Sequence, residues 1–182
     1  MRLYLVRHGA AVDVEGRCIG HCDVPLSAAG AESIGCVSEW LPERPDRIIS
    51  SDLARAQASA HLLAQRWNRF VAIDARLREM NFGEWEGIRW DELERRDSTR
   101  LAAWMTDWVR VRAPGGESFE DVVARSGAWF DEAQSAWLGE TVVVVAHAGS
   151  IRAMLCIWLG LPLEWAFRLQ TGLASVSVLS VE

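Results

Sequence analysis

The sequence predicts an α/β domain built around a mainly parallel β-sheet. Strand-like and helix-like segments alternate along the 182 residues, which is the pattern of such folds. The stretch 141–146, TVVVVA, is apolar on both faces, as expected of a strand at the centre of a sheet. At roughly 150 residues per domain, the length corresponds to one domain. Because ligands of parallel sheets bind beyond the carboxyl ends of the strands, the residues that follow each strand are the first place to look for function.

The individual elements follow from apolar spacing and from turn and capping residues. We expect short strands at 2–6, 47–50, 71–74, 141–146 and 175–181, of which the last alternates in polarity and reads as an antiparallel or edge strand. We expect helices at 27–41, from 51 or 52 to 67, at 93–109, at 118–137 and at 150–159. Ser27 is a candidate N-cap, and Ser118 with Asp121 three residues later is close to a capping box. Ser51 or Asp52 is the expected cap of the helix that ends near residue 67.

Composition and charge exclude several functional classes. Half of the residues are apolar and 24% are charged, which is ordinary for a globular protein. With 19 basic and 25 acidic residues the net charge is −6, so the basic surface expected of proteins that bind nucleic acid or anionic membranes is absent. No apolar stretch reaches the ~18 residues of a membrane span, and the one at 3–6 is too short for a signal peptide. Four cysteines do not form a disulfide framework, and a cytoplasmic protein with reduced cysteines is expected.

Arginine and histidine residues follow three of the predicted strands. Arg7 and His8 follow the first strand, Arg55 follows the second, and His147 follows the strand at 141–146. These side chains can meet at one edge of the sheet. Arginine presents a planar fork of donors that suits phosphate oxygens, and the helices that begin near these positions add free amides. The sequence therefore predicts a site for a phosphoryl group.

The candidate nucleophile of this site is a histidine. The chain has no Walker-type loop, no His-Glu-x-x-His and no Gly-x-Ser-x-Gly elbow. Imidazole can attack phosphorus, and flanking arginines disfavour its protonated form. The segment 77–87 contributes candidate proton donors, of which Glu79 lies beside apolar and aromatic residues, with Glu84 and Glu86 as competitors. Burial and a bound phosphate would raise the pKa of Glu79 while the arginines would lower it, so the sign of the shift stays open.

A metal site is not expected. Cys18, His21 and Cys22 provide three soft ligands at close spacing, but no distant partner completes the set. We therefore expect neither a metal nor another cofactor.

Four sequence blocks resemble the histidine phosphatase superfamily, the group that includes cofactor-dependent phosphoglycerate mutase. The blocks are LVRHG at 5–9, SSDLARAQASA at 50–60, LREMNFGEWEG at 77–87 and VVAHAGSIR at 144–152, and their order and spacing match as well. The resemblance implies a phosphoglycerate mutase-like, three-layer α/β sandwich in which one antiparallel edge strand joins a mainly parallel sheet. It also implies one domain over 1–182 with a helical, lid-like insertion around 77–118.

The resemblance further implies roles for individual residues. His8 would be the phosphorylated nucleophile. Glu79 would protonate the leaving group and then activate water, and His147 would join it in catalysis. Arg7, Arg55 and Ala148 would bind the phosphate. Gly20 and His21 are candidate substrate-binding residues, because the corresponding loop lines the substrate entrance in relatives. Trp85 is a further candidate, as a wall of the pocket.

Within the superfamily, the chain is most similar to the α-ribazole phosphatase branch, which acts on α-ribazole 5′-phosphate in cobalamin biosynthesis. The block at 77–87, AWMTDW at 103–108 and PGGESF at 114–119 carry this likeness. Ala10, Ala11 and Val14 depart from the family pattern, which has an acidic residue, a hydroxyl residue and an asparagine there. These departures leave lower activity or altered substrate choice open.

The expected activity is a metal-independent phosphomonoesterase that acts through a phosphohistidine on a small-molecule phosphate monoester. The alternatives are mutase-type phosphoryl transfer, a broad-specificity sugar phosphatase, and a weakly active module that binds a phosphorylated ligand. A homodimer is a candidate assembly.

Overall fold

A computed structural model describes residues 1–42 and 44–180. Its five strands form one sheet in the order β3-β2-β4-β1-β5. Their bounds are β1 (Arg2–Arg7), β2 (Arg47–Ser50), β3 (Val71–Ile73), β4 (Thr141–Ala146) and β5 (Val176–Ser180). The pairs β1–β4, β2–β4 and β2–β3 are parallel, whereas β5 runs antiparallel to β1 at the edge. The predicted fold class is confirmed, and of the strand expected at 175–181 only Val181 lies outside the described residues.

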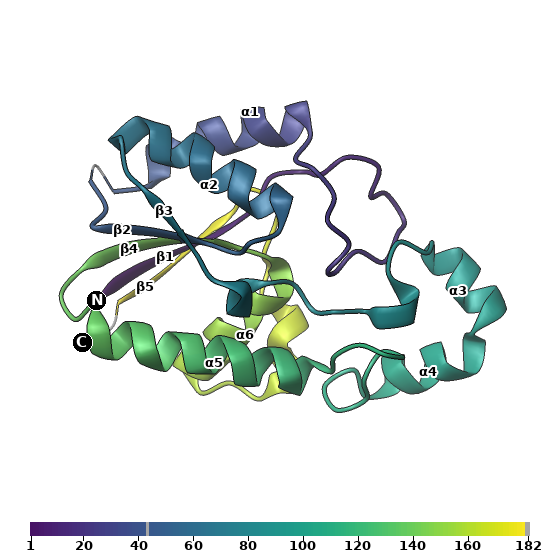
Figure 1. The fold of residues 1–182 in the computed structure, drawn as a ribbon. Coiled ribbons are helices and arrows are strands. Elements are labelled where there is room, and N and C mark those ends of the chain that lie inside the picture. The colour runs from purple at the N-terminus through teal and green to yellow at the C-terminus, as the bar shows by residue number, and fades with distance from the viewer. Residues whose placement is uncertain (43, 181–182) are drawn as a thin grey trace.

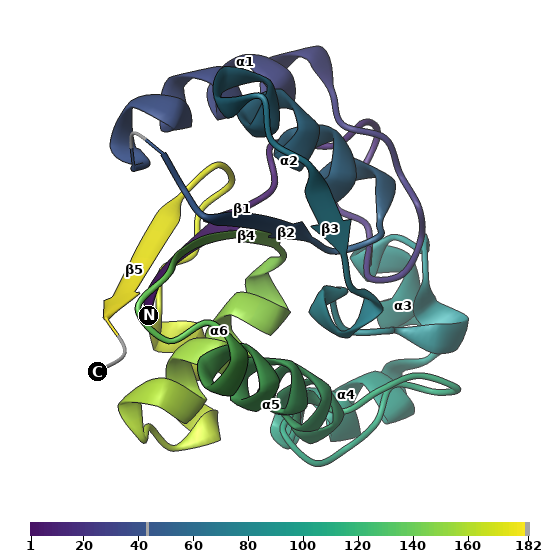
Figure 2. The same cartoon turned by 60° about the vertical axis from the view of Figure 1, so that its left-hand side comes forward.

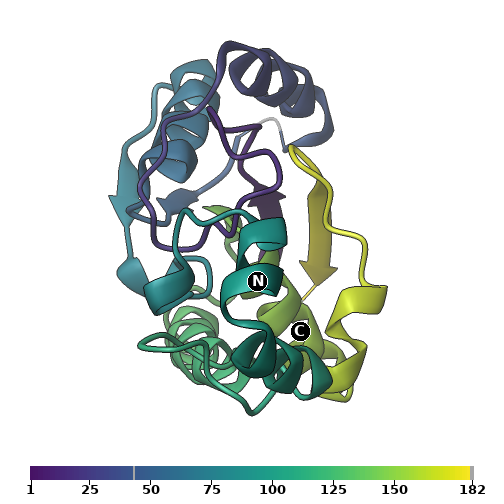
Figure 3. The same ribbon diagram turned by 90° about the vertical axis from the view of Figure 1, so that its right-hand side faces the viewer.

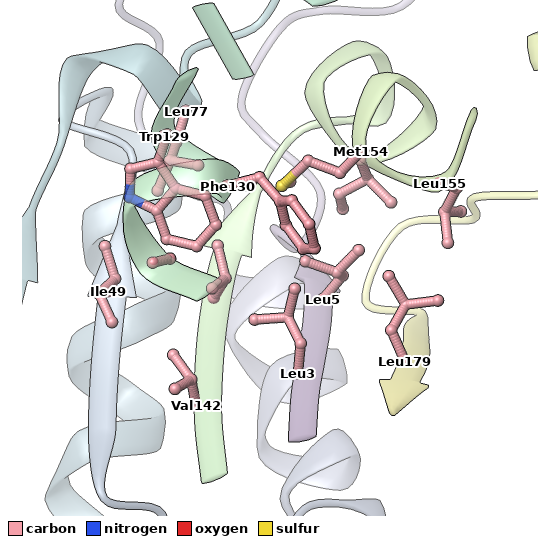
Figure 4. Close-up of a cluster of buried hydrophobic side chains, with 14 of the residues drawn as sticks. Leu3, Leu5, Ile49, Leu77, Trp129, Phe130, Val142, Met154, Leu155 and Leu179 are labelled. Carbon is pink, nitrogen blue, oxygen red and sulfur yellow. The ribbon is translucent and has the colours of Figure 1, made fainter. Parts of the chain in front are cut away.

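Helices cover both faces of the sheet and make three layers (Figure 2). On one face lie α1 (Ala28–Val37) and α2 (Ala54–Trp67), and on the other lie α5 (Phe119–Ala136) and α6 (Ala148–Leu159). Alternate residues of a strand point to opposite faces. Leu3 and Leu5 accordingly pack with Trp129 and Phe130 of α5, as Figure 4 shows, while Tyr4 and Val6 contribute to the apolar cluster on the α1–α2 face. The central strands β1 and β4 are therefore buried on both faces.

Two of the three expected N-caps are confirmed. Ser27 Oγ accepts from the Gly30 amide at 3.0 Å, and Ser118 with Asp121 forms a capping box. The cap expected for α2 is wrong, because Leu53 occupies that position. The carboxylate of Asp23, from the loop after β1, accepts from the Ala54 amide at 2.6 Å instead. Asp52 is engaged elsewhere, in an ion pair with Arg78.

The helix expected at 93–109 is two helices, α3 (Trp90–Arg96) and α4 (Ser98–Thr106). The break falls at Asp97, whose backbone leaves the helical region with φ −141° and ψ 35°. Its side chain accepts from Trp85 Nε1 at 2.8 Å and from Arg100 Nε at 2.7 Å. These contacts fix a corner that apolar spacing alone does not predict.

Short 3₁₀ turns complete the chain at Ser38–Trp40, Ala75–Leu77, Gly83–Trp85 and Leu163–Arg168. The loop after β1 and helices α3 and α4 lie at the carboxyl ends of the parallel strands (Figures 1 and 3). The segment between β3 and α5 contributes Trp85, Leu93 and Leu101 to an apolar cluster that also includes Cys18 from the loop after β1. We propose that this segment is the helical insertion expected around 77–118. Among the described residues, no helix is long and apolar enough to cross a membrane.

Candidate active site

His8 follows β1 and is held with one ring nitrogen free for chemistry. Its side chain is only 6% exposed. Nδ1 lies 2.6 Å from the carbonyl oxygen of Gly9, which can only accept, so Nδ1 carries the ring proton. Nε2 therefore keeps its lone pair, and Arg55 Nε donates toward it at 3.3 Å.

The surroundings keep the His8 ring neutral. Burial lowers its pKa to about 3, and the charges of Arg55 and Arg7 act in the same direction. A neutral imidazole with a free lone pair is the reactive form of a histidine nucleophile.

Arg55 and Arg7 bring positive charge to the same place. Arg55, the second residue of α2, is 2% exposed and donates to the carbonyls of Gly20 at 2.7 Å and Cys22 at 3.0 Å. Arg7 donates to the carbonyl of Thr171 at 2.6 Å, and its Nε has no partner among the described residues. Burial lowers the pKa of both guanidinium groups, which nevertheless stay charged at neutral pH.

His147 is the N-cap residue of α6, and its ring lies next to the ring of His8. The two ring centroids are 4.9 Å apart, and the His147 ring is fully buried. Burial, followed by the proximity of His8 and Arg55, lowers the pKa of His147 well below its usual value. Ser51 Oγ lies 2.9 Å from His147 Nε2 and accepts from the Leu53 amide. His147 Nδ1 has no hydrogen-bond partner among the described residues.

Glu79 reaches the same site from the segment after β3. Its Oε1 accepts from the amides of Met80 and Gly149, each at 2.9 Å. Gly149 belongs to the first turn of α6, where free amides favour a negative charge. Ala148, the first residue of α6, lies beside it with an amide that no carbonyl within the helix can satisfy.

Most of these residues border a cavity of about 320 Å³. Five of the predicted site residues line it: Arg7, His8, Arg55, Glu79 and Ala148. Four others are not part of its lining: His147, Gly20, His21 and Trp85. Gly20 and His21 form the loop that holds Arg55. Trp85 is 1% exposed, with its ring 6.0 Å from that of Trp104, so it lies behind the cavity wall.

The cavity also contains residues that the sequence did not single out. Arg152 lies one turn after Ala148 on α6, and its guanidinium stacks 4.9 Å from the Phe167 ring centroid. Arg17 anchors itself on the Gly87 carbonyl at 2.9 Å. Aromatic side chains form much of the wall, namely Phe82, Trp90, Trp104, Trp108, Phe119 and Phe167. The i, i+4 spacing from Ala148 was the available signal for Arg152.

Two of the departures from the family pattern lie in the cavity lining, namely Ala11 and Val14. The described residues contain no group of three or more His, Cys, Asp or Glu side chains placed to hold a metal ion. The lining combines four arginines with one carboxylate among the described residues. Such a site suits an enzyme that acts on phosphate esters.

Comparison with known proteins agrees with this class. The model of the histidine phosphatase superfamily, branch 1, matches residues 3–182. The adenosylcobalamin/alpha-ribazole phosphatase of Escherichia coli is 31% identical over 94% of this chain and 87% of its own. The glucosyl-3-phosphoglycerate phosphatase of Mycolicibacterium vanbaalenii is 37% identical over 90% of this chain and 76% of its own. The crystal structure of the alpha-ribazole phosphatase from Shigella flexneri superposes with a TM-score of 0.92, at 29% identity, over 100% of this chain and 91% of that one.

The chain therefore belongs to the histidine phosphatase superfamily. It is an enzyme with phosphatase activity, and its substrates are small phosphate esters.

Proposed function

We propose that this phosphatase is a metal-independent phosphomonoesterase that works through a phosphohistidine on His8. The observation that carries the proposal is the free lone pair of His8 Nε2, which is buried beside Arg55 while Nδ1 donates to Gly9. Positive charge from Arg7 and Arg55 would neutralise the phosphoryl oxygens without a metal ion.

The reaction takes two steps. In the first, Nε2 forms a bond to phosphorus as the ester P–O bond breaks, and protonated Glu79 gives its proton to the leaving alcohol. The Gly9 carbonyl stabilises the positive ring through Nδ1–H. In the second, the Glu79 carboxylate takes a proton from water, whose oxygen bonds to phosphorus as the P–N bond breaks. Inorganic phosphate leaves, and His8 returns to its neutral form.

His147 and Ala148 would serve the phosphoryl group rather than the leaving group. The amide of Ala148, at the positive end of α6, can donate to a phosphoryl oxygen, and so can His147 Nδ1 when it carries the ring hydrogen. We assign Gly20 and His21 to the support of Arg55, through the Gly20 carbonyl.

The aromatic wall favours a substrate whose leaving group has a flat, apolar part. Rings of Phe82, Trp90 and Trp104 lie within contact of one another, with centroids 5.9 to 6.2 Å apart, and face the cavity. α-Ribazole 5′-phosphate, with its aromatic base, suits such a wall. We therefore propose it as the substrate, with a role in cobalamin biosynthesis.

A second candidate rests on Arg17 and Arg152, which add positive charge to the cavity beyond Arg7 and Arg55. A phosphate ester that also carries a carboxylate and a sugar, such as glucosyl-3-phosphoglycerate, would use that charge. The third candidate is mutase-type transfer of a phosphoryl group between positions of a phosphoglycerate.

We also predict that the protein is located in the cytoplasm and forms a homodimer.

One substrate panel tests these alternatives. Turnover of p-nitrophenyl phosphate in EDTA supports the metal-independent phosphatase, and loss of turnover that added Mg²⁺ or Zn²⁺ restores would overturn metal independence. The proposal expects the highest kcat/KM for α-ribazole 5′-phosphate. A higher value for glucosyl-3-phosphoglycerate would favour the second candidate, and conversion of 3-phosphoglycerate to its isomer would favour the mutase.

A further inference from the structure

The carboxylate of Glu86 accepts hydrogen bonds from four backbone amides, although Glu86 does not line the cavity. Oε1 accepts from His21 at 2.7 Å and Phe82 at 2.9 Å, and Oε2 accepts from Gly20 at 3.0 Å and Cys22 at 2.8 Å. Three of these amides are consecutive, so a single side chain fixes the loop 20–22. Hydrogen bonds to an ionised carboxylate are the strong kind.

The loop that Glu86 fixes is the one that holds Arg55. The carbonyls of Gly20 and Cys22 turn toward α2 and accept from the two terminal nitrogens of Arg55. The remaining Arg55 nitrogen, Nε, then faces His8 Nε2 at 3.3 Å. A continuous set of hydrogen bonds therefore runs from Glu86 through the loop and Arg55 to the nucleophile.

Arg125 on α5 performs a parallel task around Glu79. Its Nη1 donates to the carbonyls of Arg76 at 2.7 Å and Arg78 at 2.8 Å, and its Nη2 donates to the Glu79 carbonyl at 2.8 Å. Glu117 holds the Arg125 guanidinium at 2.9 and 3.0 Å and also accepts from the Asn81 amide at 2.8 Å. This ion pair thus fixes the backbone on both sides of Glu79. The Glu79 carbonyl also lies 2.9 Å from His21 Nε2, in the loop that Glu86 fixes, but Arg125 holds residues 76, 78 and 79 without that loop.

We propose that Glu86 and Arg125 are positioning residues that serve different halves of the reaction. Glu86 acts through loop 20–22 on Arg55 and His8, and so on the phosphoryl group. Arg125 acts through the backbone of 76–79 on the carboxylate of Glu79, and so on the proton given to the leaving group. The inference rests on the roles proposed above for His8 and Glu79.

The test compares two substrates that differ in their need for a proton. Nitrophenolate leaves without one, whereas the alkoxide of glycerol 2-phosphate requires it. The quantity to compare is kcat/KM, because it reports on steps up to loss of the alcohol and is blind to the later hydrolysis of the phosphohistidine.

Glu86→Gln retains the shape of the side chain but places an NH₂ group against two amide donors. We expect kcat/KM to fall about tenfold or more on both substrates alike, since misplacing a catalytic group by about 1 Å can cost about 100-fold. The inhibition constant of vanadate, which occupies the phosphoryl position, should rise as well. Glu84→Gln, in the same turn but exposed and paired with Arg100, is the matched control and should leave both values unchanged.

Arg125→Met removes the donors and retains most of the length of the side chain. We expect a loss of about 10- to 100-fold on glycerol 2-phosphate, a loss of less than about threefold on p-nitrophenyl phosphate, and unchanged inhibition by vanadate. Arg125→Lys retains the charge beside Glu117 and should recover part of the loss on glycerol 2-phosphate. Thermal melts of each variant check that the fold is intact. If Arg125→Met does not fold, the kinetics of Arg125→Lys on the two substrates provide the test instead.

Equal losses on both substrates for the Arg125 variants, or a leaving-group preference in Glu86→Gln, would overturn the division of labour. Glu79→Gln separates this failure from failure of the proposed function. If Glu79→Gln itself shows no preference between the two substrates, the acid role of Glu79 fails. If it does and Arg125→Met does not, only the positioning role fails.

Discussion

Arg55 Nε points at the one ring nitrogen of His8 that no carbonyl engages, across 3.3 Å. The positive charge therefore borders the very atom that would form the bond to phosphorus. It disfavours a proton on Nε2, and it is placed to meet the phosphoryl oxygens once they arrive.

The first prediction concerns this nitrogen. His8→Asn should lower turnover of p-nitrophenyl phosphate by at least about 10³-fold, because among the described residues no other imidazole, and no thiol or hydroxyl group, lines the cavity. Mass spectrometry of the wild-type enzyme, quenched in alkali during turnover, should find a phosphoryl group on residue 8. His61→Asn is the control, since His61 is exposed on α2, where its Nδ1 hydrogen-bonds to the Gln57 carbonyl of the same helix. A variant without His8 that keeps normal turnover would rule out the phosphohistidine.

The second prediction concerns the proton donor. Glu79→Gln should reduce kcat/KM on glycerol 2-phosphate by roughly 10²- to 10⁴-fold and on p-nitrophenyl phosphate far less. The amide cannot supply a proton, but it still fits against the Gly149 and Met80 amides through its oxygen. Steady-state kinetics with both substrates measure the effect, and equal losses would contradict the acid role.

The third prediction concerns stability against pH. The native pKa values of His8 and His147 lie below those in the unfolded chain, so the unfolded state binds more protons between pH 6.5 and about 3. The free energy of unfolding should therefore fall as the pH falls through this range, by up to about 1.4 kcal/mol per pH unit for each ring. Urea unfolding at pH 6.5 and pH 5 measures the slope. In His8→Asn the slope should shrink by up to one proton, and an unchanged slope would be the contrary result.

The fourth prediction concerns the aromatic wall. Trp90→Ala should raise KM for α-ribazole 5′-phosphate several-fold while leaving KM for glycerol 2-phosphate nearly unchanged, because stacking on an aromatic base is worth about 1–3 kcal/mol. Trp165→Ala is the matched control, since Trp165 is 44% exposed and not part of the cavity lining. Similar KM changes for both phosphates would indicate a general packing defect instead.

The fifth prediction concerns Val14, which lines the cavity where the family pattern has an asparagine. Val14→Asn should strengthen inhibition by inorganic phosphate about tenfold, because a hydrogen bond to a charged group contributes about 1.5–3 kcal/mol. Val12→Asn, at a 38% exposed position not in the lining, should change nothing. Weaker inhibition in Val14→Asn would show that the apolar wall excludes water to the benefit of binding.

The sequence predicted the sheet well, and it predicted that Arg7, His8, Arg55 and His147 lie together at one edge of it, because both depend on local patterns. Apolar runs located every strand, and the polar residues that follow strands in parallel sheets meet at a single edge. The break at Asp97 and the cap of α2 were missed because each depends on partners far along the chain, Trp85 and Asp23. Trp85 was expected at the cavity and Arg152 was overlooked for the same reason. Sequence spacing shows which side of an element a residue occupies, but it does not show which distant residues face that side.

The Asp23 cap has a consequence for attempts to transplant this chemistry. Helix α2 carries Arg55 in its first turn, yet its leading amide is satisfied by a carboxylate thirty-one positions earlier in the chain. A copy of residues 50–60 grafted into another protein would contain the Arg55 guanidinium. It would lack the Asp23 carboxylate that stabilises the start of the helix. A design that transfers Arg55 to another scaffold would therefore also have to include the long loop between β1 and α1.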